Sequence, residues 1–316
     1  MGELSRGTTV CDFEPDERER QHSISSALAS TNYAGIHINI IDTPGYPDFA
    51  GRAISVLPAA EAALVVINAK SGIETNTSRM MQAAAERGMC RMIVINKIDD
   101  PETDAESLLD EIRETFGSEC LPLNLPAEGG RSVVDCFLDK GSGDTDFSSV
   151  DDAHTQLVDQ VVEVDENLME LYLEQGEELE AERLHDAFEQ AMREGHLVPV
   201  VFTSAETGAG IEDLLRVISK LMPNPLEGNP VQLTRAGAEV ELSGAGEDDV
   251  VAHVFKVAID AFVGRLGVFR IHQGTINSAS QLYAGDARKP FKVGHLFKLQ
   301  GKEQVEIDRG VPGDIC

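Results

Sequence analysis

The sequence predicts an α/β protein with a doubly wound parallel sheet, an inserted α+β subdomain and, after these, a partial β-barrel. Continuous apolar runs of strand length alternate with segments of helical periodicity between residues 35 and 221, a pattern typical of a sheet covered on both faces. Residues 118–196 interrupt this alternation. After residue 248 the pattern changes to strand-like runs separated by glycine-containing turns.

The composition bounds the class of protein. A chain of 316 residues has room for two or three domains. The net charge of -29 argues against non-specific adhesion to nucleic acid or an anionic membrane, although a local basic contact stays possible. Five scattered cysteines without C-x-x-C spacing indicate neither a disulfide framework nor a zinc site. Without a long apolar run or a signal-like segment, we expect a cytoplasmic protein with no membrane and no DNA as partner.

The first 30 residues show no clear helical or strand period before Ser23. One interpretation is a solvated loop or a frayed terminus. The other is a mobile loop that orders around a nucleotide phosphate and a metal ion, with the hydroxyl of Ser23 as a ligand of the ion. The residues leave both interpretations open.

The next stretch predicts a strand over residues 35–42 that ends in the turn Asp42-Thr43-Pro44-Gly45. Ligands of open α/β sheets bind beyond the carboxyl ends of strands. Asp42 could therefore hold Mg²⁺ through water, and the backbone N–H of Gly45 could reach a terminal phosphate. The alternative is an ordinary turn.

Strand and helix signals alternate after this turn. The apolar runs 63–69 and 92–95 read as buried parallel strands, because they are almost continuously apolar. Helical periodicity marks a short helix from residue 53, a helix over 75–87 and another after Pro101.

Asn96-Lys97-Ile98-Asp99 follows directly after the strand 92–95. Guanine presents its N1–H and its N2–H₂ side by side, and the carboxylate of Asp99 could accept from both, whereas adenine lacks this donor pair. The amide of Asn96 could tie neighbouring loops together, and the stem of Lys97 could lie along the base. Four polar residues after a strand can also be a plain loop, but their place after D-T-P-G favours guanine recognition.

The interrupting segment predicts short strands near residues 121–125 and 133–138 and a flexible loop over 140–151. Two helices follow, over 153–175 and 178–194. Their acidic faces are either solvated surface or a docking face for a partner helix.

The main sheet resumes with the strand 197–202, followed by Thr203-Ser204-Ala205 and a glycine-bearing turn. Such a turn can direct backbone N–H groups outward, so those of Ser204 and Ala205 could contact the guanine carbonyl. A helix over 211–221 closes this domain. The later strands are predicted over 250–257, 267–271 and 291–299.

Together these motifs resemble the elongation factor G group of translational GTPases. The similar stretches, in the family's order, are G-T-T-V-C-D-F-E-P-D-E-R-E-R, I-N-I-I-D-T-P-G-Y-P-D-F, N-K-I-D, the acidic helices, T-S-A-E-T-G-A-G and V-F-K-V-A-I-D. The chain looks closest to the elongation-factor-G-like paralogues, including ribosomal-protection-type relatives. The resemblance implies a P-loop-NTPase-type G domain over 1–225, an inserted subdomain at about 120–196, a linker over 226–248 and an incomplete β-barrel domain II over 249–316.

The resemblance also implies GTP/GDP and Mg²⁺ as ligands and the ribosome, with its rRNA and ribosomal proteins, as partner. Hydrolysis of GTP to GDP and phosphate would drive ribosome movement or ribosome rescue. The alternative is a ribosome-binding interaction module with a non-hydrolysing G-domain scaffold. The resemblance assigns roles to residues by their position in the motifs. Asp42 and Ser23 would hold the metal, and Gly45 would contact the γ-phosphate. Guanine would be contacted by Asn96, Lys97, Asp99, Ser204 and Ala205.

Three departures from the family pattern matter. No G-x-x-x-x-G-K-[ST] motif occurs, so we expect a product truncated at both ends, with very weak nucleotide affinity and no activity of its own. Tyr46 stands where the family has the His that orients the attacking water, and a tyrosine is a poor substitute for an imidazole. Tyr46 could instead merely pack beside Pro47 and Phe49. In the third departure, Gln21-His22-Ser23-Ile24-Ser25 replaces R-G-I-T-I.

Overall fold

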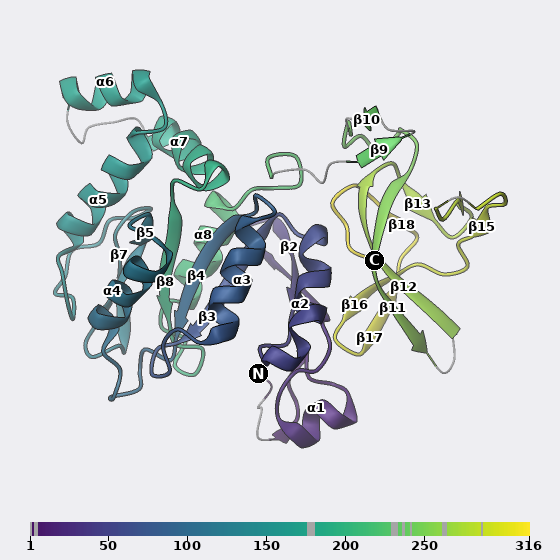
Figure 1. Cartoon of the computed structure of the whole chain (residues 1–316), viewed down its shortest axis with the longest axis horizontal. Helices are drawn as coiled ribbons and strands as arrows, with labels where there is room; N and C mark the ends of the chain where they lie inside the picture. The colour runs from purple at the N-terminus through teal and green to yellow at the C-terminus, as the bar shows by residue number, and fades with distance from the viewer. Residues whose placement is uncertain are drawn as a thin grey trace. The chain divides into compact units, whose positions relative to one another are not determined.

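The computed structural model describes residues 2, 6–175, 181–228, 233–235, 238–240, 242–260, 264–285 and 287–316. The chain divides into two compact units, Met1–Ala60 with Pro225–Cys316 and Glu61–Asn224. Figure 1 shows the elements of both. This division groups the first 60 residues with the β-rich C-terminal part, whereas the sequence analysis assigned them to the α/β domain. The domain boundaries inferred from the sequence stay a prediction.

A four-stranded parallel sheet forms the centre of the unit Glu61–Asn224 (Figure 1). Its strand order is β3-β4-β8-β5, and each neighbouring pair is parallel. The runs that form β4 and β8 are almost wholly apolar because both of their faces are covered. The prediction of a parallel α/β sheet is confirmed. The strands are β3 Ala62–Asn68, β4 Cys90–Asn96, β5 Cys120–Pro122 and β8 Val198–Thr203.

Helices cover both faces of this sheet, and each face has its own core. Side chains alternate along β4, so that Ile93 joins one core with Ile112 while Met92 joins the other with Val217. Each of these four side chains is almost fully buried. The helices that flank the strands are α3 Thr75–Ala85, α4 Ala105–Phe116 and α8 Ile211–Leu221.

The inserted segment supplies an antiparallel hairpin and three helices. The root of the hairpin is tied to the main sheet, because the buried Asn124 side chain pairs with both backbone polar groups of Phe202. The elements are β6 Asn124–Ala127, β7 Ser132–Asp135, α5 Val150–Val162, α6 Glu166–Gln175 and α7 Ala181–Glu194.

The expectation of one continuous helix over 153–175 is wrong. The carboxylate of Asp165 accepts from the backbone N–H groups of Asn167 (2.8 Å) and Leu168 (3.2 Å), which caps a new helix after α5 has ended. Of the next expected helix, residues 178–180 lie outside the described residues.

The N-terminal part of the other unit is more ordered than the sequence indicated. Residues expected as a loop include α1 Pro15–Arg20 and β1 Ala27–Tyr33. Helix α1 begins with a capping box. The side chain of Glu14 accepts from the backbone N–H of Glu17, and the side chain of Glu17 accepts from the backbone N–H of Glu14. The following elements are β2 Ile36–Asp42, the 3-10 helix η2 Pro47–Phe49, α2 Ala50–Val56 and the 3-10 helix η3 Leu57–Ala59.

Strand β2 was expected in the same sheet as the strands that end at Asn96 and Thr203. That expectation is wrong for this structure, because β2 pairs antiparallel with β1 in a two-stranded sheet of its own. Its alternating polar and apolar residues fit a strand with one solvated face.

The C-terminal part is built of antiparallel strand pairs, which confirms the expected β-rich second domain. Its longest pair, β11–β12, has two register shifts of the β-bulge type. Two short strands, β9 and β10, lie within the predicted linker 226–248. The strands are β9 Leu233–Arg235, β10 Ala238–Val240, β11 Val251–Asp260, β12 Gly264–Gln273, β13 Ile276–Asn277, β14 Gln281–Leu282, β15 Phe291–Lys292, β16 Phe297–Gln300, β17 Glu303–Glu306 and β18 Arg309–Gly310.

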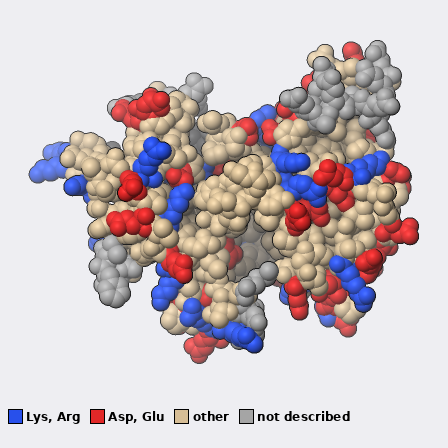
Figure 2. Space-filling view, turned by 180° about the vertical axis from the view of Figure 1, so that it is seen from behind, with Lys and Arg blue, Asp and Glu red and all other residues tan. Residues whose placement is uncertain are grey.

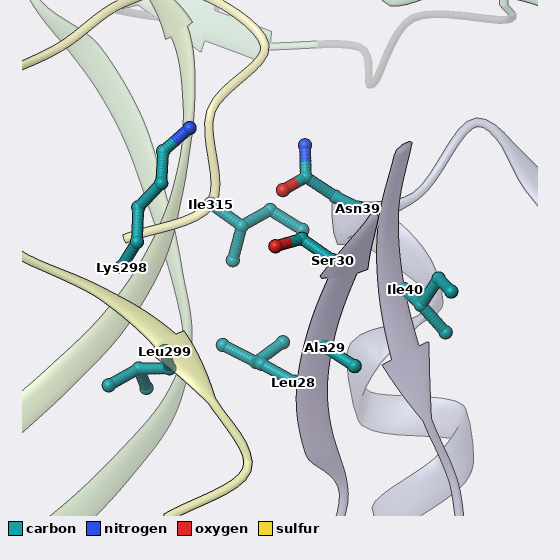
Figure 3. Close-up of a pocket in the computed structure, with 8 residues that line it drawn as sticks. All are labelled: Leu28, Ala29, Ser30, Asn39, Ile40, Lys298, Leu299 and Ile315. Atoms are coloured by element: carbon teal, nitrogen blue, oxygen red, sulfur yellow. The ribbon is translucent and has the colours of Figure 1, made fainter. Parts of the chain in front are cut away.

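Within this unit, the β1–β2 hairpin packs against the C-terminal strands. Leu28, Leu299 and Ile315 face one another around a small cavity (Figure 3). Backbone polar groups join the same surfaces, since the N–H of Gly301 donates to Leu28 O over 2.7 Å. At about 10 Å³ the cavity has room for one water at most, so it is no nucleotide pocket.

Charged side chains of both signs are interspersed on the face shown in Figure 2. Among the described residues, no helix combines the length and the apolar character that crossing a membrane requires.

Candidate functional site

The loop Asn96-Lys97-Ile98-Asp99 begins at the last residue of β4. The side-chain oxygen of Asn96 accepts from the backbone N–H of Lys97 (2.9 Å) and from that of Ala205 (3.0 Å). The second bond is the tie between neighbouring loops expected from the sequence. It forms because Asn96 and Thr203 are register partners at the ends of adjacent parallel strands, β4 and β8.

Asp99 carries the most informative feature of this loop. Its Oδ1 is buried, and no hydrogen-bond donor reaches that atom in the described part of the chain. The preceding residue, Ile98, is only 4% exposed, and its N–H donates to Thr203 O over 3.3 Å. A buried acceptor without a donor costs free energy, so this oxygen is suited to a ligand that brings an N–H group.

Lys97 is exposed and has a left-handed backbone with a φ of 67°. That conformation turns the chain sharply between Asn96 and Ile98 and leaves the lysine stem in solvent, where it could lie along a base. Close to this loop, Lys70 forms ion pairs with Asp100 and Glu102 that the sequence analysis did not anticipate.

The turn after β8 matches the prediction only in part. Ala205 is exposed, and its N–H donates to Asn96, so a guanine carbonyl could share that donor. Ser204 is fully buried, and its N–H donates to Ala209 O over 2.8 Å. In this structure Ser204 therefore shapes the turn, because its hydroxyl also accepts from Thr207 N–H, and it offers no backbone donor to a base.

The predicted phosphate and metal residues lie in the other unit. Asp42 ends β2, and burial raises the pKa of its carboxyl, as do the nearby carboxylates of Asp12 and Glu17, although a hydrogen bond from Cys11 opposes the shift. Crowded carboxylates of this kind favour a bound cation. Gly45 is exposed, and a Cβ on it would meet nothing within 4 Å. The fold itself therefore leaves room for a side chain at position 45, and a requirement for glycine there would come from a bound ligand.

Ser23 has a defined partner. Its hydroxyl donates to Asp12 Oδ1 over 2.7 Å, which leaves the oxygen lone pairs of Ser23 available to a metal. Mg²⁺ usually takes one or two protein ligands and completes its shell with water and phosphate oxygens. Asp42 and Ser23 fit that requirement. No cluster of three or more His, Cys, Asp or Glu side chains arranged for a metal is found among the described residues.

Two residues that the sequence analysis missed hold the segment around Ser23. Glu17 is 2% exposed, and its carboxylate accepts from the N–H groups of Ile24 and Ser25, each over 3.0 Å. From the other side, the Arg52 guanidinium donates to Ile24 O (2.7 Å) and to the Ser25 hydroxyl (2.8 Å). The spacing of Glu14 and Glu17 is that of a capping box, so the sequence could have indicated that Glu17 accepts backbone hydrogen bonds. No local signal marks Arg52.

Tyr46 is 54% exposed and lies against His22, with ring centroids 4.3 Å apart. The ring nitrogen Nδ1 of His22 is 3.0 Å from Arg20 O. Because a carbonyl oxygen only accepts, Nδ1 carries the hydrogen and Nε2 keeps its lone pair in the neutral ring. Tyr46 thus has an aromatic partner other than the Pro47 and Phe49 considered from the sequence.

The predicted site residues therefore fall into two groups. Asn96, Asp99 and Ala205 are brought together by β4 and β8 in one unit. Ser23 and Asp42 belong to the other unit, where Asp12 links Ser23 to the surroundings of Asp42. The sequence analysis placed the strand over 35–42 in the same sheet as the strands that precede Asn96 and Ser204, and that expectation is wrong, since β2 is outside that sheet.

Comparisons with known proteins show which families the chain matches. The family model described as elongation factor Tu GTP binding domain matches residues 2–224, and that of elongation factor G domain 2 matches residues 249–316. An "Elongation factor G-like protein" of Mycobacterium tuberculosis is 32% identical over 345 residues, in strain CDC 1551 / Oshkosh and in strain ATCC 25618 / H37Rv alike. That alignment covers 100% of this chain and 48% of the relative.

A crystal structure of a protein from Thermus thermophilus is similar with a TM-score of 0.82 and 30% identity. The match covers 99% of this chain and 47% of that one. The chain thus spans about half the length of the relatives it matches.

Proposed function

Because the chain belongs to the elongation factor Tu GTP-binding domain family and continues into an elongation factor G domain 2, we propose that its α/β unit recognises guanine nucleotides. The observation that carries this proposal is the buried Oδ1 of Asp99, which has no donor among the described residues. Guanine offers adjacent N1–H and N2–H₂ donors to such a carboxylate. The hydrogen bond from the Ala205 N–H to Asn96 joins the Ala205 turn to the loop that contains Asp99, so one base could contact both loops.

We assign the phosphate end to the N-terminal residues, in a protein of the relatives' full length that contains this chain, called the longer protein below. Asp42 would hold Mg²⁺ through water, the hydroxyl of Ser23 would ligate it, and the N–H of Gly45 would meet the γ-phosphate. Bound Mg²⁺ would neutralise charge on the phosphate oxygens. Asp12 would orient the Ser23 hydroxyl, because it already accepts the hydrogen of that group.

The whole protein is proposed to hydrolyse GTP to GDP and phosphate in the cytoplasm, and to couple this step to ribosome movement or ribosome rescue. Its partners would be rRNA and ribosomal proteins. The support is the match to both family models and to elongation factor G-like relatives. We expect the present 316 residues to bind GDP more weakly than micromolar, because they contain no G-x-x-x-x-G-K-[ST] motif to cradle the phosphates.

A second candidate is a ribosome-binding interaction module that keeps a non-hydrolysing G-domain scaffold. Tyr46 favours it, since a phenol is a poor substitute for an imidazole as a general base at neutral pH. Turnover of GTP by the longer protein, measured in the presence and absence of ribosomes, separates the two candidates. Ribosome binding without turnover would support the module.

Base recognition can be tested on the chain itself with nucleoside monophosphates, which do not depend on a phosphate loop. Ligand-detected NMR should show GMP binding in preference to AMP. Asp99→Asn should weaken GMP and favour XMP, because xanthine presents a carbonyl where guanine has its amino group. We expect a change of at least about tenfold, since hydrogen bonds to charged groups are worth about 1.5–3 kcal/mol.

Asp100→Asn is the matched control for this experiment. It removes the neighbouring carboxylate, which faces Lys70 and accepts from the Glu102 N–H. The control should keep the preference for GMP. Equal binding of GMP and AMP by the unaltered chain would refute the proposed function.

A further inference from the structure

The turn of the inserted hairpin touches the loop that would read guanine. Gly130, within this turn, is buried. A Cβ built on Gly130 would clash with Ile98 O and lie 2.6 Å from Ile98 C and 3.2 Å from Asp99 N. The backbone of the turn therefore packs directly against the peptide that joins Ile98 to Asp99, and only glycine allows this approach.

The turn has a left-handed backbone at three successive residues. Glu128, Gly129 and Gly130 have φ values of 57°, 70° and 74°. A left-handed conformation is unfavourable for a residue with a side chain, such as Glu128, and persists where the surrounding structure enforces it. Glycine adopts a positive φ readily, so the unfavourable residue is Glu128, and a contact from elsewhere in the structure would help to hold the turn.

Asp146 supplies that contact. Its Oδ1 accepts from the N–H of Gly129 and its Oδ2 from the N–H of Gly130, each over 2.9 Å. Its own N–H donates to Pro126 O over 2.8 Å, near the end of β6. One carboxylate thus binds two successive backbone donors, and charge-assisted hydrogen bonds of this kind are among the stronger ones.

Asp146 is itself anchored to the main sheet. The ring of Phe147 packs edge-on against Phe202 in β8, with centroids 5.8 Å apart. The sequence predicted a flexible loop here, but Phe147 packs against the apolar core and Asp146 binds the hairpin. A continuous series of contacts therefore runs from β8 through Phe147 and Asp146 to the turn, and from the turn to Ile98.

We propose that Asp146 and Gly130 are positioning residues for base recognition, which set the Asp99 carboxylate from the side of the inserted subdomain. This inference rests on the proposed function, because it assigns the base to Asp99. According to this inference, the inserted subdomain contributes to the selectivity of the site for guanine. The turn acts on the backbone of Asp99 and does not touch the nucleotide.

Two alanine substitutions in the turn form a matched pair. Gly129→Ala and Gly130→Ala impose the same strain, since both residues have a positive φ, but a Cβ on Gly129 would meet nothing within 4 Å. Only Gly130→Ala displaces the peptide before Asp99. We expect amide hydrogen exchange at Asp99 and Asp100 to accelerate by about tenfold or more in Gly130→Ala relative to Gly129→Ala.

The affinity for GMP, measured by ligand-detected NMR, should fall by about tenfold or more in Gly130→Ala relative to Gly129→Ala. Asp146→Ala should act in the same direction, and Asp146→Asn should recover part of the loss because one amide oxygen can still accept. Asp144→Ala removes a nearby exposed carboxylate and serves as its control. Because Asp146→Ala keeps both glycines, it decides the question if Gly130→Ala does not fold.

Equal exchange rates and equal GMP affinities in the two glycine variants would overturn the inference. If the unaltered chain binds GMP no better than AMP, the proposed function fails. The exchange rates at Asp99 and Asp100 then still decide whether the turn positions this loop. Slower or unchanged exchange in Gly130→Ala and in Asp146→Ala would refute the positioning role by itself.

Discussion

Replacing Asn124 by alanine should strongly destabilise the unit Glu61–Asn224, although the substitution removes only one small side-chain amide. The Asn124 side chain is 1% exposed, accepts from Phe202 N–H over 2.8 Å and donates to Phe202 O over 3.2 Å. The substitution leaves both backbone groups of Phe202 buried without these partners. Each unpaired group costs about 1–3 kcal/mol, so we expect the free energy of unfolding to fall by about 2–6 kcal/mol.

The assay is equilibrium urea unfolding followed by far-ultraviolet circular dichroism, together with hydrogen exchange at the Phe202 amide. Asn68→Ala is the control, because that side chain accepts a more exposed hydrogen bond from Lys70 N–H in the same unit. The control should lose less than about 1 kcal/mol. A loss of that size in Asn124→Ala, with Phe202 exchange unchanged, would show that water replaces the lost bonds and that the reasoning is wrong.

Three other predictions concern the unit formed by Met1–Ala60 and Pro225–Cys316. Glu17→Ala removes the acceptor of three backbone N–H groups, those of Glu14, Ile24 and Ser25, and should lower stability by about 3 kcal/mol in urea unfolding, whereas the exposed Glu19→Ala should change it little. Burial lowers the pKa of His272 from 6.5 to about 4, so folding favours its neutral form. Stability should therefore be complete above about pH 6.5 and decline as the pH falls toward about 4, and His272→Gln should flatten that part of a urea-midpoint profile. In the longer protein, Tyr46→His should raise GTP turnover by about a hundredfold, measured as phosphate release, and an equal or lower rate would count against a catalytic role for this position.

Strong local patterns predicted the centre of the fold and one part of the site. The apolar runs of β4 and β8 identify buried parallel strands, and their polar ends then must meet at one edge of the sheet. Asn96 and Ala205 are accordingly joined by a hydrogen bond.

Other features depend on partners far away in the chain. Asn124 meets Phe202 across 78 residues, and Gly129 meets Asp146 across 17. Nothing in the local sequence marks Asp146 as a clamp, because an aspartate in a Gly/Ser-rich stretch is typical of an exposed loop. Likewise β2 has the pattern of a strand, but the pattern does not say which strand it pairs with.

The sequence by itself determined the α/β class, the alternation of strands and helices in the main sheet, and the residue types that can contact guanine, because periodicity and turn chemistry are local. Only the tertiary structure decided that Ser204 is buried, that Glu17 and Arg52 clamp the segment around Ser23, and that an inserted turn presses on Asp99. The free energies of these contacts depend on burial and three-dimensional packing that no local pattern encodes.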